Sequence, residues 1–180
     1  MLGLLALAEY KKTLWYYTKV EFRLKTEEIM EVIIRIESNN FIPGCSDPDT
    51  INIVTKGSFE VKNGAYILNY TEPMSEGEGD VTTTITVDSS NVVDVMRSGK
   101  NSSRLTVEKG RRHLCNYDTG YGCLMIGLYG EQIKSCLNGN SGEILMRYTL
   151  DVNSEYQSLN ELKVNFEAPA KSGDNSISLE

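Results

Sequence analysis

The chain has 180 residues, a formal net charge of −7, 40% hydrophobic residues and 24% charged residues. The length fits one domain with a core of its own. The acidic balance argues against a protein that tracks nucleic-acid phosphates or docks on anionic membranes. Fifteen Gly, ten Tyr and an abundance of Val, Ile and Thr favour β structure.

The cysteines are not spaced as metal ligands. Cys45, Cys115, Cys123 and Cys136 form no CxxC or CxxH pair, which are spacings typical of zinc sites. We therefore expect no metal and no other cofactor. Because the short apolar run Leu2–Ala8 has no basic residues before it, it does not read as a signal peptide or a membrane span. We expect a cytoplasmic protein with reduced cysteines.

Residues 1–29 differ from the rest of the chain, because their apolar residues follow neither a helical nor a strand period. An amphipathic or partner-binding helix is one interpretation of this extension. We favour the hypothesis that the true start is Met30, because the purine-rich codons of Glu27-Glu28 resemble a ribosome-binding site. Detecting a peptide from residues 1–29 in native extract would refute it.

From Met30 onward the hydrophobic pattern has a period close to two, which predicts strands. Asn63-Gly64 predicts a tight hairpin turn, and Gly57 interrupts a long strand, as at a bulge or a bend. Pro and Gly residues mark 39–49 as a loop. The strands predicted in this half cover residues 32–37, 51–61, 65–71 and 81–88.

The stretch from Val92 to Gly122 combines three predicted strands with most of the unusual polar residues. The strands cover 92–97, 104–108 and 111–117. The polar residues include Arg97, Arg104, the only histidine His113, and the pair Tyr117 and Tyr121.

The last third continues the alternation. Strands are predicted at 123–132, 143–152 and 159–166, whereas the polar, Ser-rich stretch 168–180 is predicted to be a disordered tail. The pattern thus predicts an all-β domain over residues 30–167. We expect a single antiparallel up-and-down β-barrel of about 8 to 10 strands, with a two-sheet sandwich as the alternative.

Short runs spread in order between Glu31 and Phe166 carry a family resemblance. They are Gly57, Ile67-Leu68-Asn69-Tyr70 followed by Glu72, Thr83-Thr84-Ile85, Met96-Arg97-Ser98-Gly99, Ser103-Arg104-Leu105 and Tyr117–Gly122. In these runs the chain resembles the YwiB-like family, small bacterial proteins of unknown function. The resemblance implies a calycin-type (lipocalin-like) β-barrel and carries over no catalytic residue.

The residues favour binding over catalysis. One histidine cannot build a multi-His metal site, and the chain has no nucleophile elbow, Walker loop or GxGxxG motif after a strand. A small hydrolase or isomerase is therefore the least favoured function. A barrel of this size has room for one small ligand, contacted by alternate residues of each strand.

Arg97 is the predicted charge anchor for a small anionic or polar ligand inside the barrel, because it is in phase with Val93 and Val95. A structural ion pair with Glu72 or Asp94, or a solvated strand end, is the alternative for this side chain. The predicted ligand-binding set is Arg97, Arg104 as second donor, His113, Tyr117, Tyr121, Tyr148 and Glu72.

A third function class is an interaction or structural protein whose barrel is filled by its own side chains and whose surface docks a partner. The residues large enough to fill a small barrel are Phe59, Tyr66, Leu68, Met146 and Tyr148. An open interior lined by arginine supports ligand binding, and a packed interior supports docking. The sequence leaves monomer and dimer open.

Overall fold

Alternating apolar and polar residues build ten strands in the described part of the chain. The computed structural model describes residues 29–72, 79–99, 102–119 and 122–169. The strands are β1 (Met30–Phe41), β2 (Asp49–Lys62), β3 (Ala65–Glu72), β4 (Val81–Val87), β5 (Val93–Ser98), β6 (Ser103–Val107), β7 (Arg112–Asp118), β8 (Cys123–Leu137), β9 (Ser141–Val152) and β10 (Glu155–Glu167).

The strands form one closed antiparallel barrel. Each pairs with its neighbours in the chain, and β1 pairs with β10 to close the ring. The predicted up-and-down barrel is confirmed, and the sandwich alternative is excluded because the ring of paired strands is unbroken.

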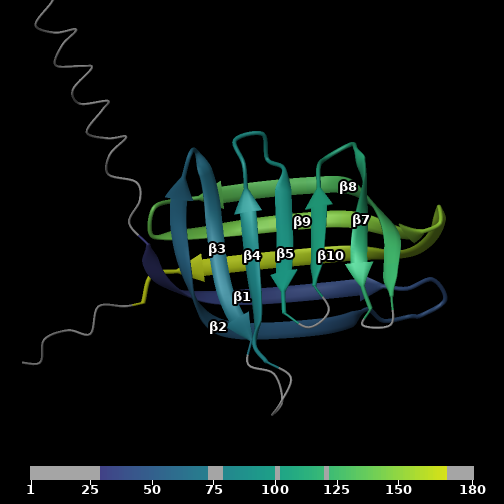
Figure 1. The fold of residues 1–180 in the computed structure, drawn as a ribbon, viewed down its shortest axis with the longest axis horizontal. Helices are drawn as coiled ribbons and strands as arrows, with labels where there is room; N and C mark the ends of the chain where they lie inside the picture. Colours follow the sequence, from purple (N-terminus) through teal and green to yellow (C-terminus); the bar gives the residue numbers. More distant parts are fainter. Residues whose placement is uncertain (1–28, 73–78, 100–101, 120–121, 170–180) are drawn as a thin grey trace, which may run out of the picture.

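Two long strands turn the corners of the barrel. In Figure 1, β3 to β7 run upright, whereas β8, β9, β10 and β1 run across them, and β2 and β8 bend from one direction to the other. The bend in β2 confirms the role predicted for Gly57: a Cβ atom there would lie only 2.3 Å from the Asn69 carbonyl oxygen. The bend in β8 coincides with a register shift between Gly130 and Gln132.

The hairpin between β2 and β3 confirms the turn predicted at Asn63-Gly64, since both residues have positive φ angles, 52° and 80°. Several predicted boundaries were wrong, among them the start of β10, which lies at Glu155 instead of residue 159. β1 and β2 extend into the predicted loop 39–49, because Asn39 pairs with Thr50. The Asn39 Oδ1 atom also accepts a hydrogen bond from the Thr50 hydroxyl at 2.7 Å. β8 likewise extends to Leu137 instead of ending at residue 132.

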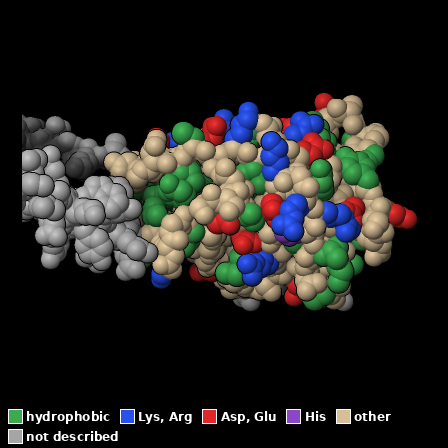
Figure 2. All heavy atoms as spheres, turned by 90° about the horizontal axis from the view of Figure 1, so that it is seen from above, with side chains coloured by type: hydrophobic (Ala, Val, Ile, Leu, Met, Phe, Trp, Pro, Cys, Tyr) green, Lys and Arg blue, Asp and Glu red, His purple; other side chains and the backbone are tan. Residues whose placement is uncertain are grey.

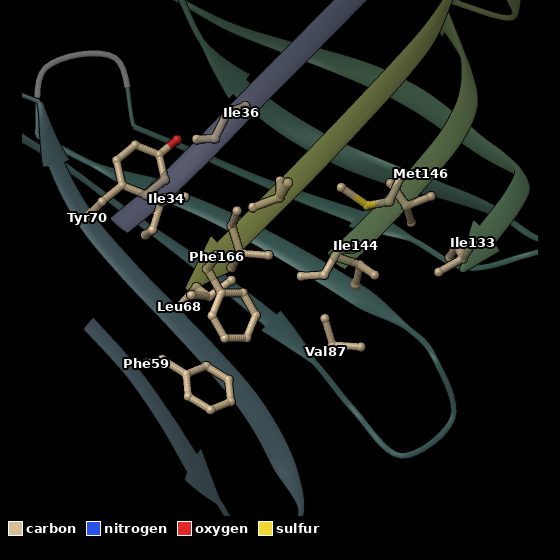
Figure 3. Close-up of a cluster of buried hydrophobic side chains, with 14 of the residues drawn as sticks. Ile34, Ile36, Phe59, Leu68, Tyr70, Val87, Ile133, Ile144, Met146 and Phe166 are labelled. Atoms are coloured by element: carbon tan, nitrogen blue, oxygen red, sulfur yellow. The ribbon is translucent and has the colours of Figure 1, made fainter. Parts of the chain in front are cut away.

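The apolar faces of the strands meet in one core. Figure 3 shows the Phe59 and Phe166 rings together between β2 and β10, and their centroids are 4.6 Å apart. Leu128 and Val164 are completely buried. Of the residues predicted to fill the barrel, Phe59, Leu68 and Met146 are buried in this core, and Tyr66 and Tyr148 pack against it.

The seam between β6 and β7 is the weakest pairing of the barrel. A single register pair, Ser103 with Tyr117, joins the two strands. Further along, the Thr106 N–H donates to the buried Cys115 Sγ at 3.4 Å instead of to a backbone carbonyl. A sulfur acceptor is weak, so this part of the wall is held less firmly than its neighbours.

The outer face carries ion pairs. Figure 2 shows acidic and basic side chains interspersed with apolar ones on one side of the molecule. Arg112 binds Asp151 through two contacts, 2.8 Å from Nε and 2.6 Å from Nη2. The hydrogen bond from Arg112 lowers the pKa of the Asp151 carboxyl below its ordinary value of 3.8.

Asp151 is expected to contribute to acid unfolding. Because folding lowers its pKa, its carboxylate stabilises the fold above pH 3.8 and loses this contribution as the pH falls through the folded pKa. The Asp151→Asn variant should therefore lose less stability than the wild type between about pH 5 and pH 2, as measured by urea unfolding across the pH range. Glu60→Gln on β2 is the control, and an identical pH profile for Asp151→Asn and wild type would contradict the assignment.

The predicted N-terminal extension, apart from Ile29, and residues 170–180 of the predicted tail lie outside the described residues. No helix able to cross a membrane occurs in the part of the chain that the structure describes.

Candidate functional site

Inward-facing polar side chains form a continuous row at one end of the barrel. Tyr70 on β3 is paired with Thr83 on β4, Thr83 with Arg97 on β5, Arg97 with Ser103 on β6, and Ser103 with Tyr117 on β7. Direct cross-strand neighbours have Cβ atoms about 4.5–5.5 Å apart, so the five side chains are adjacent. We call these five residues the Arg97 row.

Two polar atoms of the Arg97 row are buried without a hydrogen-bond partner among the described residues. They are Arg97 Nε and Thr83 Oγ1. Thr83 is 1% exposed, so solvent does not satisfy its hydroxyl. Each buried group left unpaired costs about 1–3 kcal/mol, so two such groups on paired residues are the unusual feature of the row.

The guanidinium of Arg97 also forms the ion pair that the sequence offered as an alternative. Its Nη2 lies 3.2 Å from Glu72 Oε2, and the two side chains are 43% and 26% exposed. A single contact to Glu72 leaves the Nε–H edge of the guanidinium unpaired. One end of the Arg97 guanidinium, Nη2, thus forms a solvated ion pair, while its Nε–H is a buried donor without a partner.

Tyr70 is a neutral hydrogen-bonding group in this row. Burial raises the pKa of its hydroxyl, and the Glu72 carboxylate raises it further. The Thr83 hydroxyl lies near enough to oppose this rise, but it does not meet the geometry of a hydrogen bond. At neutral pH the Tyr70 hydroxyl consequently keeps its proton.

Arg104, predicted as the second donor, does not lie in the Arg97 row. It alternates with the inward-facing Leu105 and the buried Val107, so its side chain lies on the outer surface. There it is 68% exposed, and its Nη2 lies 3.2 Å from Asp94 Oδ2.

The other predicted residues are distributed between the row and more distant positions. Tyr117 belongs to the row and is 38% exposed. His113, near the opposite end of β7, has its Nε2 2.9 Å from Glu108 Oε2. Tyr148 faces inward from β9, where burial raises its pKa to about 12. Tyr121 lies outside the described residues.

The sequence analysis missed Tyr70, Thr83 and Ser103 as members of the site. The signal that finds them is strand phase. Thr83 is in phase with the inward-facing Ile85 and Val87, and Tyr70 is in phase with the buried Leu68. Small hydroxyl residues in the buried phase of a strand are therefore better candidates than exposed arginines.

Two comparisons relate this architecture to known proteins. The family model described as "Domain of unknown function (DUF1934)" matches residues 34–164. The ywiB protein from Bacillus subtilis, known from a crystal structure, has a TM-score of 0.69 at 23% sequence identity, and the match covers 79% of this chain and 94% of that chain. No curated protein sequence matches the chain.

The structural likeness supports the barrel fold and, at this identity, nothing about a ligand. The family match covers the strands from within β1 to within β10, and so it includes every residue of the Arg97 row. The chain therefore belongs to the DUF1934 family, a family of unknown function whose YwiB-like fold is a closed β-barrel.

Proposed function

We propose that the protein binds a small polar or anionic molecule at the Arg97 row, inside the end of the barrel, and does so in the cytoplasm without catalysing a reaction. The observation that carries this proposal is the pair of buried, unpartnered groups at Arg97 Nε and Thr83 Oγ1. An oxyanion, carboxylate or phosphate, presents two oxygen atoms to these two neighbouring donors.

The positive charge of Arg97 and the hydroxyl groups around it support an oxyanion as the ligand. Arg97 is the one basic residue of the row, and Glu72 contacts only its Nη2. The Tyr70 and Ser103 hydroxyls lie on both sides of the Thr83–Arg97 pair and supply further donors. His113 is bonded to Glu108 and not to a cysteine or serine, which leaves nucleophilic catalysis without support at this histidine.

A matched pair of arginines tests the proposal. Arg97 and Arg104 each form a 3.2 Å ion pair with a carboxylate, but only Arg97 faces the interior. Binding of carboxylates and phosphate esters should weaken about tenfold or more in Arg97→Ala, because a hydrogen bond to a charged group contributes about 1.5–3 kcal/mol. Arg104→Ala should bind as the wild type does.

The measurement is native mass spectrometry for co-purifying molecules, followed by calorimetric titration with a set of carboxylates and phosphate esters. Thr83→Val keeps the shape of the buried side chain and removes the hydroxyl, so it should also weaken binding. Equal binding by Arg97→Ala and Arg104→Ala, or a wild type that binds no member of either class, refutes the proposal.

Docking of a partner is the second candidate, and a packed region of the interior favours it. Phe59 lies with its ring stacked on Phe166 and also 6.1 Å from Tyr66, so this part of the barrel is filled by side chains. On the outer face, Leu114 and Met125 are 61% and 57% exposed. This candidate requires that the double variant Leu114→Ser/Met125→Ser loses binding of the partner and that Arg97→Ala retains it.

A further inference from the structure

A second row of inward-facing polar side chains lies on the other side of the barrel. Tyr148 on β9 is paired with Asn160 on β10, and Asn160 with Asn40 on β1. These positions continue the inward phase of Met146 and Leu162. We call Tyr148, Asn160 and Asn40 the Tyr148 row.

This row offers an unpartnered acceptor. Asn40 Oδ1 is buried and has no hydrogen-bond partner among the described residues. The Asn160 amide, in contrast, has a partner, because its Nδ2 donates a hydrogen bond to the buried Ser158 Oγ at 3.0 Å. A buried carbonyl oxygen without a donor costs about 1–3 kcal/mol, so a donor group from a bound molecule would be stabilised there.

Tyr148 adds a hydroxyl that stays protonated at neutral pH, since burial raises its pKa to about 12. It is able to donate a hydrogen bond to an oxygen or nitrogen atom next to Asn40. The Tyr148 row therefore combines one unsatisfied acceptor with a neutral donor, whereas the Arg97 row carries the positive charge and an unsatisfied donor.

The two rows face each other. In the ring of ten strands, β10 lies five places from β5, β9 five places from β4, and β1 five places from β6. Asn160 thus stands on the wall opposite the strand of Arg97, Tyr148 opposite that of Thr83, and Asn40 opposite that of Ser103. Closed barrels of about this size are able to hold one small ligand, and a molecule lying between these two walls would contact both rows.

We infer that the ligand of the Arg97 row also carries a hydroxyl group, which donates a hydrogen bond to Asn40 Oδ1 and accepts one from Tyr148. The ligand class is a small hydroxylated carboxylic acid or phosphate ester. This inference rests on the proposed function, because the Arg97 row holds the oxyanion.

Pairs of compounds that differ by hydroxylation test this inference. They are butyrate with 4-hydroxybutyrate, hexanoate with 6-hydroxyhexanoate, and propyl phosphate with glycerol 3-phosphate, all titrated calorimetrically at one ionic strength. In the wild type at least one hydroxylated compound should bind about tenfold or more tightly than its parent, as expected for a hydrogen bond to an otherwise unpaired buried group.

Two variants locate the preference. Tyr148→Phe and Asn40→Ala should reduce it to less than about threefold, because the affinity for the hydroxylated compound falls toward that for its parent. The controls are Tyr156→Phe, an exposed tyrosine of β10, and Asn39→Ala, the neighbouring asparagine, whose Oδ1 accepts from Thr50 on the outer face. Both controls should keep the wild-type preference. Since Tyr148→Phe removes one oxygen atom only, it carries the test if Asn40→Ala fails to fold.

The outcomes separate the two proposals. Equal affinity of the wild type for every hydroxylated compound and its parent overturns this inference and leaves oxyanion binding at the Arg97 row intact. A preference that survives in both Tyr148→Phe and Asn40→Ala also overturns it. If the wild type binds no compound of either kind, the proposed function fails and this inference fails with it.

Discussion

Phe166→Ala is expected to lower the free energy of unfolding by about 3–5 kcal/mol, the usual loss when a buried phenylalanine is truncated. Phe166 is 2% exposed, lies on the closing strand β10 and stacks on Phe59 of β2. Its removal leaves a cavity where the strands that close the barrel meet (Figure 3). The loss is a large share of the 5–15 kcal/mol that typically stabilises a domain.

Urea unfolding followed by circular dichroism measures this change. Tyr156→Ala is the control, because Tyr156 is an aromatic residue of the same strand and is 53% exposed. Its effect should stay within about 0.5 kcal/mol. Similar losses in the two variants would mean that the Phe59–Phe166 contact does not contribute to the core.

Gly57→Ala is expected to lower the free energy of unfolding by about 1–3 kcal/mol, the cost of inserting one methyl group into a filled space. A Cβ atom at Gly57 would lie 2.3 Å from the Asn69 carbonyl oxygen and 2.5 Å from Ile34 Cδ1. The first of these atoms belongs to the backbone of β3, so the corner of β2 must open to admit the methyl group.

The matched control is Gly139→Ala in the connection between β8 and β9. No atom lies within 4 Å of the Cβ position at Gly139, and its φ angle is not in the left-handed region. This substitution should leave the stability unchanged within about 0.5 kcal/mol or raise it, since alanine restricts the unfolded chain. Equal stability of the two variants in urea would show that β2 does not need a glycine at its bend.

Strand phase made much of the fold predictable from the sequence. In β4, Val81, Thr83, Ile85 and Val87 are buried and the intervening threonines are not, as their alternation predicts. The same argument placed Arg97 on the inner face, because the phase of a residue is a local property.

The candidate site was predictable only in part. Arg104 was assigned by residue type, although the phase of Leu105 and Val107 already places it outside. The Tyr148 row requires the register between β9, β10 and β1, which depends on pairing between distant parts of the chain. No local pattern around Asn40 indicates Asn160 as its neighbour.

The order of strands in the ring has a consequence for the kinetics of folding. Nine of the ten pairings join strands that follow one another in the chain, and each is able to form as a local hairpin. The tenth, between β1 and β10, links the two ends of the barrel and carries the largest single loop-closure entropy of the ten. During synthesis, β1 therefore waits with an unpaired edge until the ribosome has released β10, the interval in which this chain is most exposed to aggregation.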